Sequence, residues 1–203
     1  LFWQSISGDS DPELLLETGF PLNAGHFSAD GKYLVYSQTH TDTEADLWLM
    51  DLESDRSTTP LVVSPFRESQ PAISPSGEWI AYHSDDTGRF EIYLRPFPTS
   101  AERFQVSTSG GEEPRWRGDG RELFYRNGNA MMAVDVSVDG ELRLGKPRKL
   151  FERDADIKSR FDVTPDGERY FVVELGESDS QPTQLNIVQN WTEELKRLVQ
   201  TEN

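Results

Sequence analysis

The sequence predicts an all-β fold, a β-propeller of four-stranded antiparallel blades, and three observations predict it. A polar turn ending in Gly, followed by a mostly apolar run, occurs four times: FSADGKYLVY (27–36), ISPSGEWIAY (73–82), WRGDGRELFY (116–125) and VTPDGERYFV (163–172). The turn glycines Gly31, Gly77, Gly120 and Gly167 are 46, 43 and 47 residues apart, close to the length of a propeller blade. Between them, aromatic and β-branched runs alternate with Gly, Pro, Asp and Ser clusters, as strands alternate with turns.

Each complete repeat contains four such runs, enough for one blade. In the first repeat these are HFS, YLVYSQT, ADLWLMDL and PLVVS; in the second, residues 70–74, 79–85, 90–97 and 103–108; in the third, EPRWR, ELFYRN, AMMAVDV and RKLFE. LFWQSIS and ELLLET supply two more strands near the N-terminus. The predicted organisation is a single domain over 1–203, with a half blade (1–25), three blades (26–69, 70–112 and 113–159), an incomplete blade (160–190) and a C-terminal helix (191–203).

The recurring turn has a physical explanation. A Ser or Thr at its start bonds the nearby backbone, Asp tolerates turn geometry, and Gly adopts a positive φ without steric cost. We therefore interpret Asp30, Asp119 and Asp166 as turn-forming residues rather than catalytic acids. The run Asp85-Asp86-Thr87-Gly88 is interpreted in the same way, as a hairpin turn between two strands.

The two ends of the array suggest an open ring. The expected strands do not fill a whole number of blades, so we predict a partial arc of about four and a half blades, with its natural start upstream of Leu1. A propeller removes its edges by closing. We expect a second copy of the chain to cover the exposed edges, which makes a homo-oligomer. Near the C-terminus, Asn190 and Glu193 resemble a helix cap and Trp191, Leu195, Leu198 and Val199 share one helical stripe.

Composition excludes several classes of function. With 20 basic and 36 acidic residues the formal net charge is −16, which repels nucleic acid and anionic lipid. No apolar run approaches the roughly 18 residues of a membrane span, so we expect no membrane insertion of this segment. The absence of Cys excludes disulfides, thiolate metal sites and a Cys nucleophile.

The search for catalytic motifs predicts a protein that is not an enzyme and needs no cofactor. G-x-S-x-G, H-E-x-x-H, G-x-x-x-x-G-K-[ST], G-x-G-x-x-G, H-R-D and D-F-G do not occur. His26, His40 and His83 are scattered along the sequence. Asp42, Glu44 and Asp46 alternate as in a calcium loop but lack the Gly and the later Glu of an EF-hand, so they are weak metal candidates and a solvated turn is the simpler interpretation.

Binding candidates come instead from the start of each innermost strand, where side chains from successive blades face the mouth of the central channel. By repeat position these are His26, Gln70, Glu112 or Glu113, and Arg160. Converging polar groups can hold a small ligand, a cation or a partner's peptide, and the simpler alternative is that they bind water. The aromatic residues Trp48, Trp79, Phe90, Tyr93, Trp116 and Tyr125 occupy repeat-locked positions, which indicates packing between blades.

These turns and strands resemble the TolB-like, or WD-like, propeller repeats, whose signature is an S-P-D-G turn followed by I-A-F/Y and D-I-Y/W-V strands. The similarity covers nearly the whole chain, with departures at Ala29, Ser76 and the third turn, which lacks Ser-Pro. EIYLRPFP (91–98), residues 110–136 and residues 185–199 are similar to the C-terminal propeller of bacterial proteins in which such repeats often follow a serine/threonine kinase domain and a membrane segment.

The resemblance implies an extracytoplasmic, periplasmic sensor or scaffold module that binds a protein or peptide partner at its channel mouth. Two alternatives stay open. One is the propeller of a serine peptidase of the prolyl oligopeptidase type, against which the missing G-x-S-x-G argues. The other is a stand-alone periplasmic TolB-like envelope protein, which a signal peptide without an upstream kinase domain would distinguish.

Overall fold

The structure is a computed structural model, and it describes residues 1–98, 101–153 and 161–172. Every regular element within these residues is a β-strand. The predicted helix at 191–203 and most of the incomplete blade at 160–190 lie outside the described residues. In the described part of the chain, no helix is long and apolar enough to cross a membrane.

Three antiparallel sheets follow one another along the chain. The first contains β3 (Leu22–Phe27), β4 (Tyr33–Gln38), β5 (Asp46–Asp51) and β6 (Thr58–Val62). The second contains β7 (Glu68–Ile73), β8 (Trp79–Ser84), β9 (Glu91–Pro96) and β10 (Phe104–Gln105). The third contains β11 (Glu112–Trp116), β12 (Glu122–Asn127), β13 (Ala130–Val138) and β15 (Arg148–Glu152), with β14 (Leu142–Leu144) added at the end of β13.

Two short hairpins flank these sheets. At the N-terminus β1 (Phe2–Trp3) pairs with β2 (Glu13–Leu14), and β16 (Phe161–Val163) pairs with β17 (Tyr170–Val172) to begin a fourth sheet. Only two residues of the predicted strand ELLLET are paired. The side chains of Leu15 and Leu16 pack, with Leu1, against the cluster of Leu34, Tyr36 and Met50 in the first sheet, and their amides donate to the Leu1 carbonyl at 2.9 and 3.3 Å.

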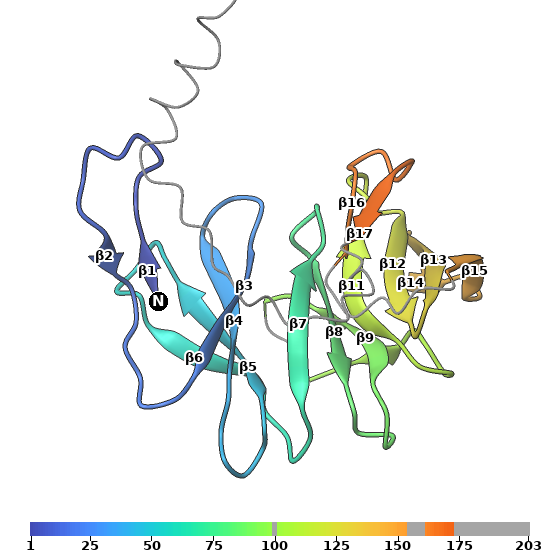
Figure 1. Ribbon diagram of the computed structural model, residues 1–203, viewed down its shortest axis with the longest axis horizontal. Helices are drawn as coiled ribbons and strands as arrows, with labels where there is room; N and C mark the ends of the chain where they lie inside the picture. Colours follow the sequence, from blue (N-terminus) through green and yellow to red (C-terminus); the bar gives the residue numbers. More distant parts are fainter. Residues whose placement is uncertain (99–100, 154–160, 173–203) are drawn as a thin grey trace, which may run out of the picture.

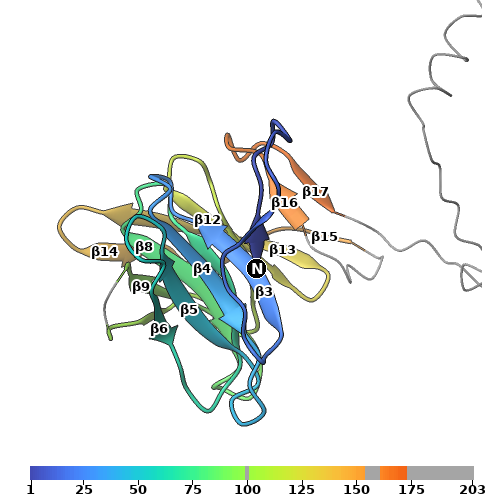
Figure 2. The same cartoon turned by 90° about the vertical axis from the view of Figure 1, so that its left-hand side faces the viewer.

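The sheets are arranged as the blades of a propeller. Figure 1 shows them side by side, and the first strand of each sheet lies against the first strand of the next, β3 against β7, β7 against β11 and β11 against β16. The view in Figure 2 shows the strands of neighbouring sheets running in similar directions. The predicted all-β propeller class is confirmed, and the described blades form an open arc.

The predicted turn chemistry is confirmed in atomic detail. In the first repeat the Ser28 carbonyl accepts from the Gly31 amide at 2.9 Å, and the Asp30 carboxylate accepts from the Lys32 amide at 3.1 Å. Asp119 and Asp166 accept the corresponding amides at 3.0 Å. All four turn glycines have positive φ, between 72° and 75°. The three aspartates therefore hold turns in place.

The third turn departs from the pattern because another turn packs against it. Gly118 donates its amide to the Pro165 carbonyl at 2.8 Å, and a Cβ atom on Gly118 would lie 2.7 Å from that oxygen. A side chain here would therefore force the third and fourth turns apart. This contact explains why Gly118 stands where the family pattern has Pro.

The core lies between blades. Val35, Leu49, Ile80, Tyr82 and Tyr93 are buried where the first sheet meets the second. A second cluster, with Ile92, Leu94, Leu123, Tyr125 and Val134, lies between the second and third sheets, and Trp79 and Trp116 pack against it. The predicted role of the repeat-locked aromatic residues in packing is therefore confirmed for these positions. Burial of each large side chain contributes about 2 to 3 kcal/mol.

Candidate functional site

A bulge in each innermost strand sets the direction of the side chains that face the channel axis. The strand register shifts between Ala24 and His26 in β3, between Ser69 and Ala72 in β7, and between Glu112 and Arg115 in β11. At the bulge Gln70 and Glu113 adopt positive φ angles of 55° and 57°. Side chains other than Gly rarely adopt this conformation, and residues held in it are concentrated at functional sites.

The bulge in the first repeat is built differently. A Cβ atom on Gly25 would lie 2.7 Å from the Pro71 side chain of β7 and would overlap the carbonyl of Val35. Gly25 therefore allows β3 and β7 to approach closely. This close approach brings the axis-facing residues of the first two blades together.

Two cavities, of about 540 and 210 Å³, run along the innermost strands and share Asn23, Ser37 and Gln70 in their walls. The larger lies between the first and second sheets and is also lined by His40, Glu44, Arg67 and Ser69. The smaller extends to His26 on β3, Arg115 on β11 and Asp162 on β16. We call the two together the inner-strand groove. Four blades contribute polar groups to it.

His26 is held as a neutral hydrogen-bond donor in this groove. Part of its ring is open to solvent, but desolvation among the surrounding strands, followed by the charge of Arg115, lowers the pKa of His26. The backbone amide of Ile73 donates to Nδ1 at 3.4 Å. Since Nδ1 accepts this hydrogen bond, the proton of the neutral ring is assigned to Nε2.

Arg115 and Asp162 face each other across neighbouring blades. Nε of Arg115 lies 4.0 Å from Oδ1 of Asp162, and one terminal nitrogen donates to the Pro114 carbonyl at 2.8 Å. The guanidinium also lies 5.7 Å from the centre of the Phe161 ring, within the range of a cation–π contact. Arg115 is therefore held by contacts with Asp162, Pro114 and Phe161. Its guanidinium cation and the Asp162 carboxylate lie together at one end of the groove.

The amides of Asn23 and Gln70 complete the polar lining. Neither side chain makes a hydrogen bond to the described residues, and Gln70 is half-buried in the walls of both cavities. An amide side chain offers two donors and an acceptor. These groups can therefore bond to a ligand without breaking any intramolecular bond that the structure describes.

Not every sequence-predicted residue reaches the groove. His26 and Gln70 do, whereas Glu112 and Glu113 turn toward β12, where their carboxylates lie 2.9 and 3.7 Å from the Arg126 guanidinium. The charge of Arg126 accounts for their direction. Arg160 lies outside the described residues.

Arg115 and Asp162 were missed, although the sequence contains a signal for them. His26, Arg115 and Asp162 each precede a turn glycine by five residues, whereas Gln70, Glu113 and Arg160 precede one by seven. The predicted set therefore mixed two repeat positions. Counting back five residues from Gly120 and Gly167 identifies the missing pair.

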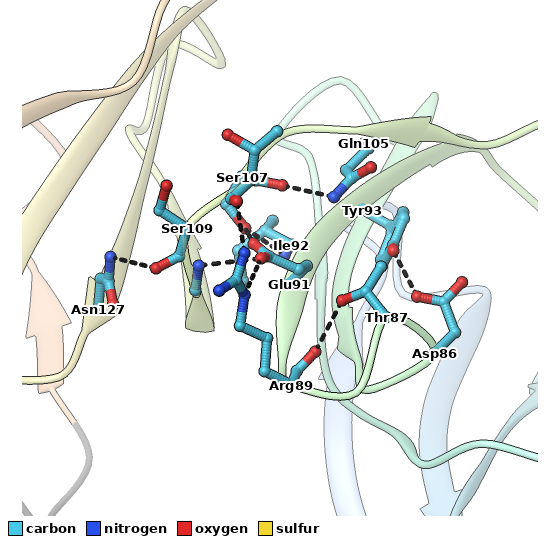
Figure 3. A network of polar contacts seen from close by, with 12 residues as sticks. Asp86, Thr87, Arg89, Glu91, Ile92, Tyr93, Gln105, Ser107, Ser109 and Asn127 are labelled. Atoms are coloured by element: carbon cyan, nitrogen blue, oxygen red, sulfur yellow. Dashed lines mark hydrogen bonds and ion pairs between the residues drawn. The ribbon is translucent and has the colours of Figure 1, made fainter.

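The third innermost strand is held in place by a polar network, drawn in Figure 3. Glu91, at the start of β9, is buried, and its Oε1 accepts from Arg89 Nε at 2.7 Å and from the Gly110 amide at 2.9 Å. Oε2 accepts from the Ser107 hydroxyl, which in turn accepts from the Ile92 amide at 2.8 Å. These bonds tie the connection at 107–111 to β9, and this connection leads directly into β11.

A Ser–His pair borders the groove, and its histidine has a strongly lowered pKa. Ser69 Oγ and His83 Nε2 are 2.5 Å apart, and Ser69 lines the larger cavity. Burial, with smaller contributions from Arg67 and Arg126, lowers the pKa of His83 to about 3. Nδ1 of His83 is buried without a hydrogen-bond partner among the described residues. A general base needs a pKa near the working pH, and a triad needs an acid on that nitrogen.

The weak metal candidates are not brought together as ligands. Asp46 is buried and accepts from the Thr43 hydroxyl at 2.5 Å, while Asp42 and Glu44 are exposed in the preceding turn. Within the described ranges, no three His, Asp or Glu side chains are grouped as a metal site requires.

Comparisons with known proteins add to this geometry. No family model matches the chain. An uncharacterized protein of Agrobacterium fabrum is 27% identical in an alignment of 179 residues that covers 79% of this chain and 59% of that protein. The structure is similar to a putative TolB from Agrobacterium tumefaciens, with a TM-score of 0.60 and 23% identity over 82% of this chain and 64% of that one.

Two further solved structures have related folds. TolB from Acinetobacter baumannii has a TM-score of 0.62 and 18% identity, covering 85% of this chain and 42% of its own. An oligogalacturonate lyase in complex with manganese has a TM-score of 0.57 and 13% identity, covering 77% and 48%. These similarities confirm the TolB-like propeller resemblance. The chain spans less than two thirds of each of these proteins, and one fold here includes proteins with different functions.

Proposed function

We propose that the chain is a non-enzymatic recognition module whose inner-strand groove binds an extended segment of a partner protein. One observation supports the proposal most directly. His26, Gln70, Arg115 and Asp162 come from four successive blades and line the same groove. Groups gathered from sequence-distant strands form a surface that no single blade provides.

The chemistry of the groove favours a polypeptide over a simple ion. Its walls offer amide groups that both donate and accept, at Asn23 and Gln70, and an imidazole donor at His26. Cations and anions are mixed along it, with Arg67 and Glu44 toward one end and Arg115 and Asp162 toward the other. A peptide presents alternating donors, acceptors and side-chain charges along its length and matches this pattern. A small polar ligand is the alternative outcome.

The absence of enzymatic activity is part of the proposal. The sequence lacks G-x-S-x-G, and the Ser69–His83 pair combines an imidazole of strongly lowered pKa with an unpartnered Nδ1. This weighs against the alternative of a serine peptidase of the prolyl oligopeptidase type. We also propose the setting that the family resemblance implies, an extracytoplasmic sensor or scaffold part of a larger bacterial protein. A stand-alone periplasmic TolB-like envelope protein is the alternative, and the reading frame upstream of Leu1 separates the two.

The test selects ligands from a random peptide library displayed on phage and measures their affinity by calorimetry. For the selected peptides, we expect Arg115→Ala and Gln70→Gly to weaken binding at least tenfold. Gln70→Gly also removes the positive-φ strain, so its fold is retained while the amide is lost. Arg143→Ala removes a cation from exposed β14, outside the groove, and serves as the matched control with unchanged affinity.

Two results would overturn the proposal. One is a set of peptides whose affinity is the same for the wild type and both groove variants. The other is a hydrolase activity that Ser69→Ala abolishes, because that would make the Ser69–His83 pair catalytic. If no peptide is selected and a small polar ligand binds instead, with an affinity that Arg115→Ala weakens, then the groove is a small-molecule site and the peptide proposal is wrong.

A further inference from the structure

A further cavity, of about 420 Å³, lies where the turns of the second and third repeats meet. Residues 74–79, residues 116–121 and the end of β13 form its walls. The two turns are in contact, because a Cβ atom on Gly120 would lie 3.7 Å from the Pro75 side chain. We call this cavity the turn cleft. It shares no lining residue with the inner-strand groove.

The third repeat has an additional hairpin beside this cleft. The third strands of the first two repeats, β5 and β9, have six residues each, whereas β13 has nine. Its extra residues pair with β14, Val136 opposite Leu144 and Val138 opposite Leu142. This added hairpin extends the blade and places Ser137 and Asp139 in the wall of the cleft.

Two half-buried tryptophans give the cleft rigid aromatic surfaces. The Trp116 indole donates its N–H to the Ala72 carbonyl at 2.9 Å, and this bond fixes the ring. Since the N–H is already bonded, Trp116 offers only its ring carbon atoms to a ligand in the cleft. The Trp79 ring packs edge-on against Phe104, with the ring centres 6.0 Å apart. The Trp79 indole N–H makes no hydrogen bond to the described residues, so it remains a donor.

Unused polar groups surround these rings. The carboxylates of Glu78 and Asp139, the hydroxyl of Ser137 and the guanidinium of Arg121 line the cleft, and none of them bonds or pairs with another described side chain. By contrast, Ser74 and Ser76 are bonded to each other at 3.1 Å. The cleft therefore combines aromatic carbon with both free acceptors and free donors.

We propose that the turn cleft binds a neutral saccharide. A sugar ring has one face rich in C–H groups, which packs against indole carbon, and adjacent hydroxyls that donate to a carboxylate and accept from N–H groups. Arg121 disfavours a cationic side chain in the cleft, whereas Glu78 and Asp139 disfavour an acidic sugar. A volume of about 420 Å³ falls within the range of small-molecule sites.

The test is a glycan array that includes neutral hexose and N-acetylhexosamine oligosaccharides and uronic acid oligomers, followed by calorimetric titration of the neutral saccharides that bind. The double variant Glu78→Ala/Asp139→Ala keeps both tryptophans and is expected to bind at least tenfold more weakly than the wild type. Glu168→Ala is the matched control, because Glu168 is exposed and follows Gly167 as Glu78 follows Gly77. It is expected to bind as the wild type does.

The outcomes separate this site from the inner-strand groove. Saccharide binding that survives Arg115→Ala and is lost in the Glu78/Asp139 double variant supports the proposal. No binding of any neutral saccharide on the array would overturn it, as would equal affinity of the double variant. Binding only of uronic acid oligomers, or of a Lys-rich and Arg-rich peptide tested in parallel, would also overturn it, because the ligand would then carry a charge.

Discussion

Glu68, at the start of β7, is a buried carboxyl at the interface between the first two blades. It is 1% exposed, and its Oε1 accepts from the hydroxyls of Ser64 at 2.6 Å and Ser84 at 3.1 Å. Its Oε2 is buried without a partner among the described residues. Desolvation, opposed by the two hydroxyls and aided by the charges of Asp46 and Asp85, raises the pKa of Glu68 to about 7.

This pKa makes blade stability depend on pH. The folded protein holds the Glu68 proton more tightly than the unfolded chain, in which the carboxyl has its ordinary pKa of 4.5. The resulting stability is fully present below the unfolded pKa and is lost as pH rises through 7. Glu68→Gln keeps the acceptor and cannot ionise. We expect its stability advantage over the wild type to grow by about 2 to 3 kcal/mol between pH 5 and pH 8.

Urea denaturation of both proteins at pH 5 and pH 8 measures this difference. Glu141→Gln, at an exposed position beside β14, is the control and should follow the wild type at both pH values. If Glu68→Gln and the wild type showed the same pH dependence, Glu68 would be ionised in the folded protein and the predicted proton linkage would be wrong.

His83, on the neighbouring strand β8, has the opposite effect on the pH dependence of stability. Its folded pKa is about 3, below the ordinary histidine pKa of 6.5, so the folded state binds this proton less tightly than the unfolded chain. Its contribution to stability is present above 6.5 and is lost as pH falls. Ser69, which contacts His83, directly follows Glu68. Between about pH 4.5 and 6.5 the two effects oppose each other, so the contributions of Glu68 and His83 to the pH dependence of stability largely cancel there.

At the scale of elements, the connection from one blade to the next depends on a single acid. Glu91 is 1% exposed and accepts from Arg89, the Ser107 hydroxyl and the Gly110 amide. Replacement by Gln keeps the shape but removes the charge that strengthens these bonds and places an amide donor opposite groups that also donate. We expect Glu91→Gln to lower the free energy of unfolding by at least about 2 kcal/mol.

Denaturation and hydrogen exchange measure this effect together. The amide of Gly110 bonds to Glu91, and the amide of Gly111 bonds to the Phe90 carbonyl at 2.8 Å, so both should exchange faster in Glu91→Gln. Thr87→Ala removes one exposed bond from the same network, to the Arg89 carbonyl at 3.2 Å, and should cost less than about 0.5 kcal/mol. Unchanged exchange at 110–111 would show that Glu91 does not hold this connection.

The elements that the sequence predicted well are those determined by local chemistry. The turns at 28–31 and 164–167 depend on a hydroxyl, a carboxylate and a glycine within four residues, and these same atoms form the observed bonds. The β14 hairpin was not predicted. The run LRL is short, and its pairing with β13 depends on an extension that the other repeats lack.

The groove was less predictable because a bulge changes which residues face the axis. Simple alternation along a strand cannot locate a register shift, and the shift near Gln70 and Glu113 requires backbone conformations that those residue types rarely adopt. Glu113 also turned away because Arg126, from the next strand, competes for it. Pairings of this kind depend on tertiary contacts.

At the scale of the whole molecule, charge is unevenly distributed between the groove and the rest of the chain. The chain has a formal net charge of −16, yet the inner-strand groove includes Arg67 and Arg115 beside Glu44 and Asp162. The overall field repels polyanions at a distance, while the groove itself is balanced. A ligand of mixed charge is therefore favoured over nucleic acid at the groove.

The described blades form an open arc, and from this arrangement we predict that the chain associates with further copies of itself. The N-terminal hairpin and the β16–β17 hairpin lie at opposite ends of the view in Figure 1. Leu1, Leu15 and Leu16 cover the first sheet, while Phe171 on β17 is 64% exposed. Exposed strand edges and apolar side chains favour association with another chain. We predict a homodimer or a larger closed assembly in which β17 lies at the contact.

Light scattering at micromolar concentration tests the assembly, with a monomer mass of 23.1 kDa as the reference. We expect a mass of at least twice this value for the wild type and a shift toward the monomer for Phe171→Glu, because burying the new charge in the contact is unfavourable. Phe66→Glu is the control, since Phe66 is also exposed, at 43%, but lies between β6 and β7. A wild-type mass near that of the monomer would contradict the prediction, and equal masses for Phe171→Glu and the wild-type assembly would place the contact elsewhere.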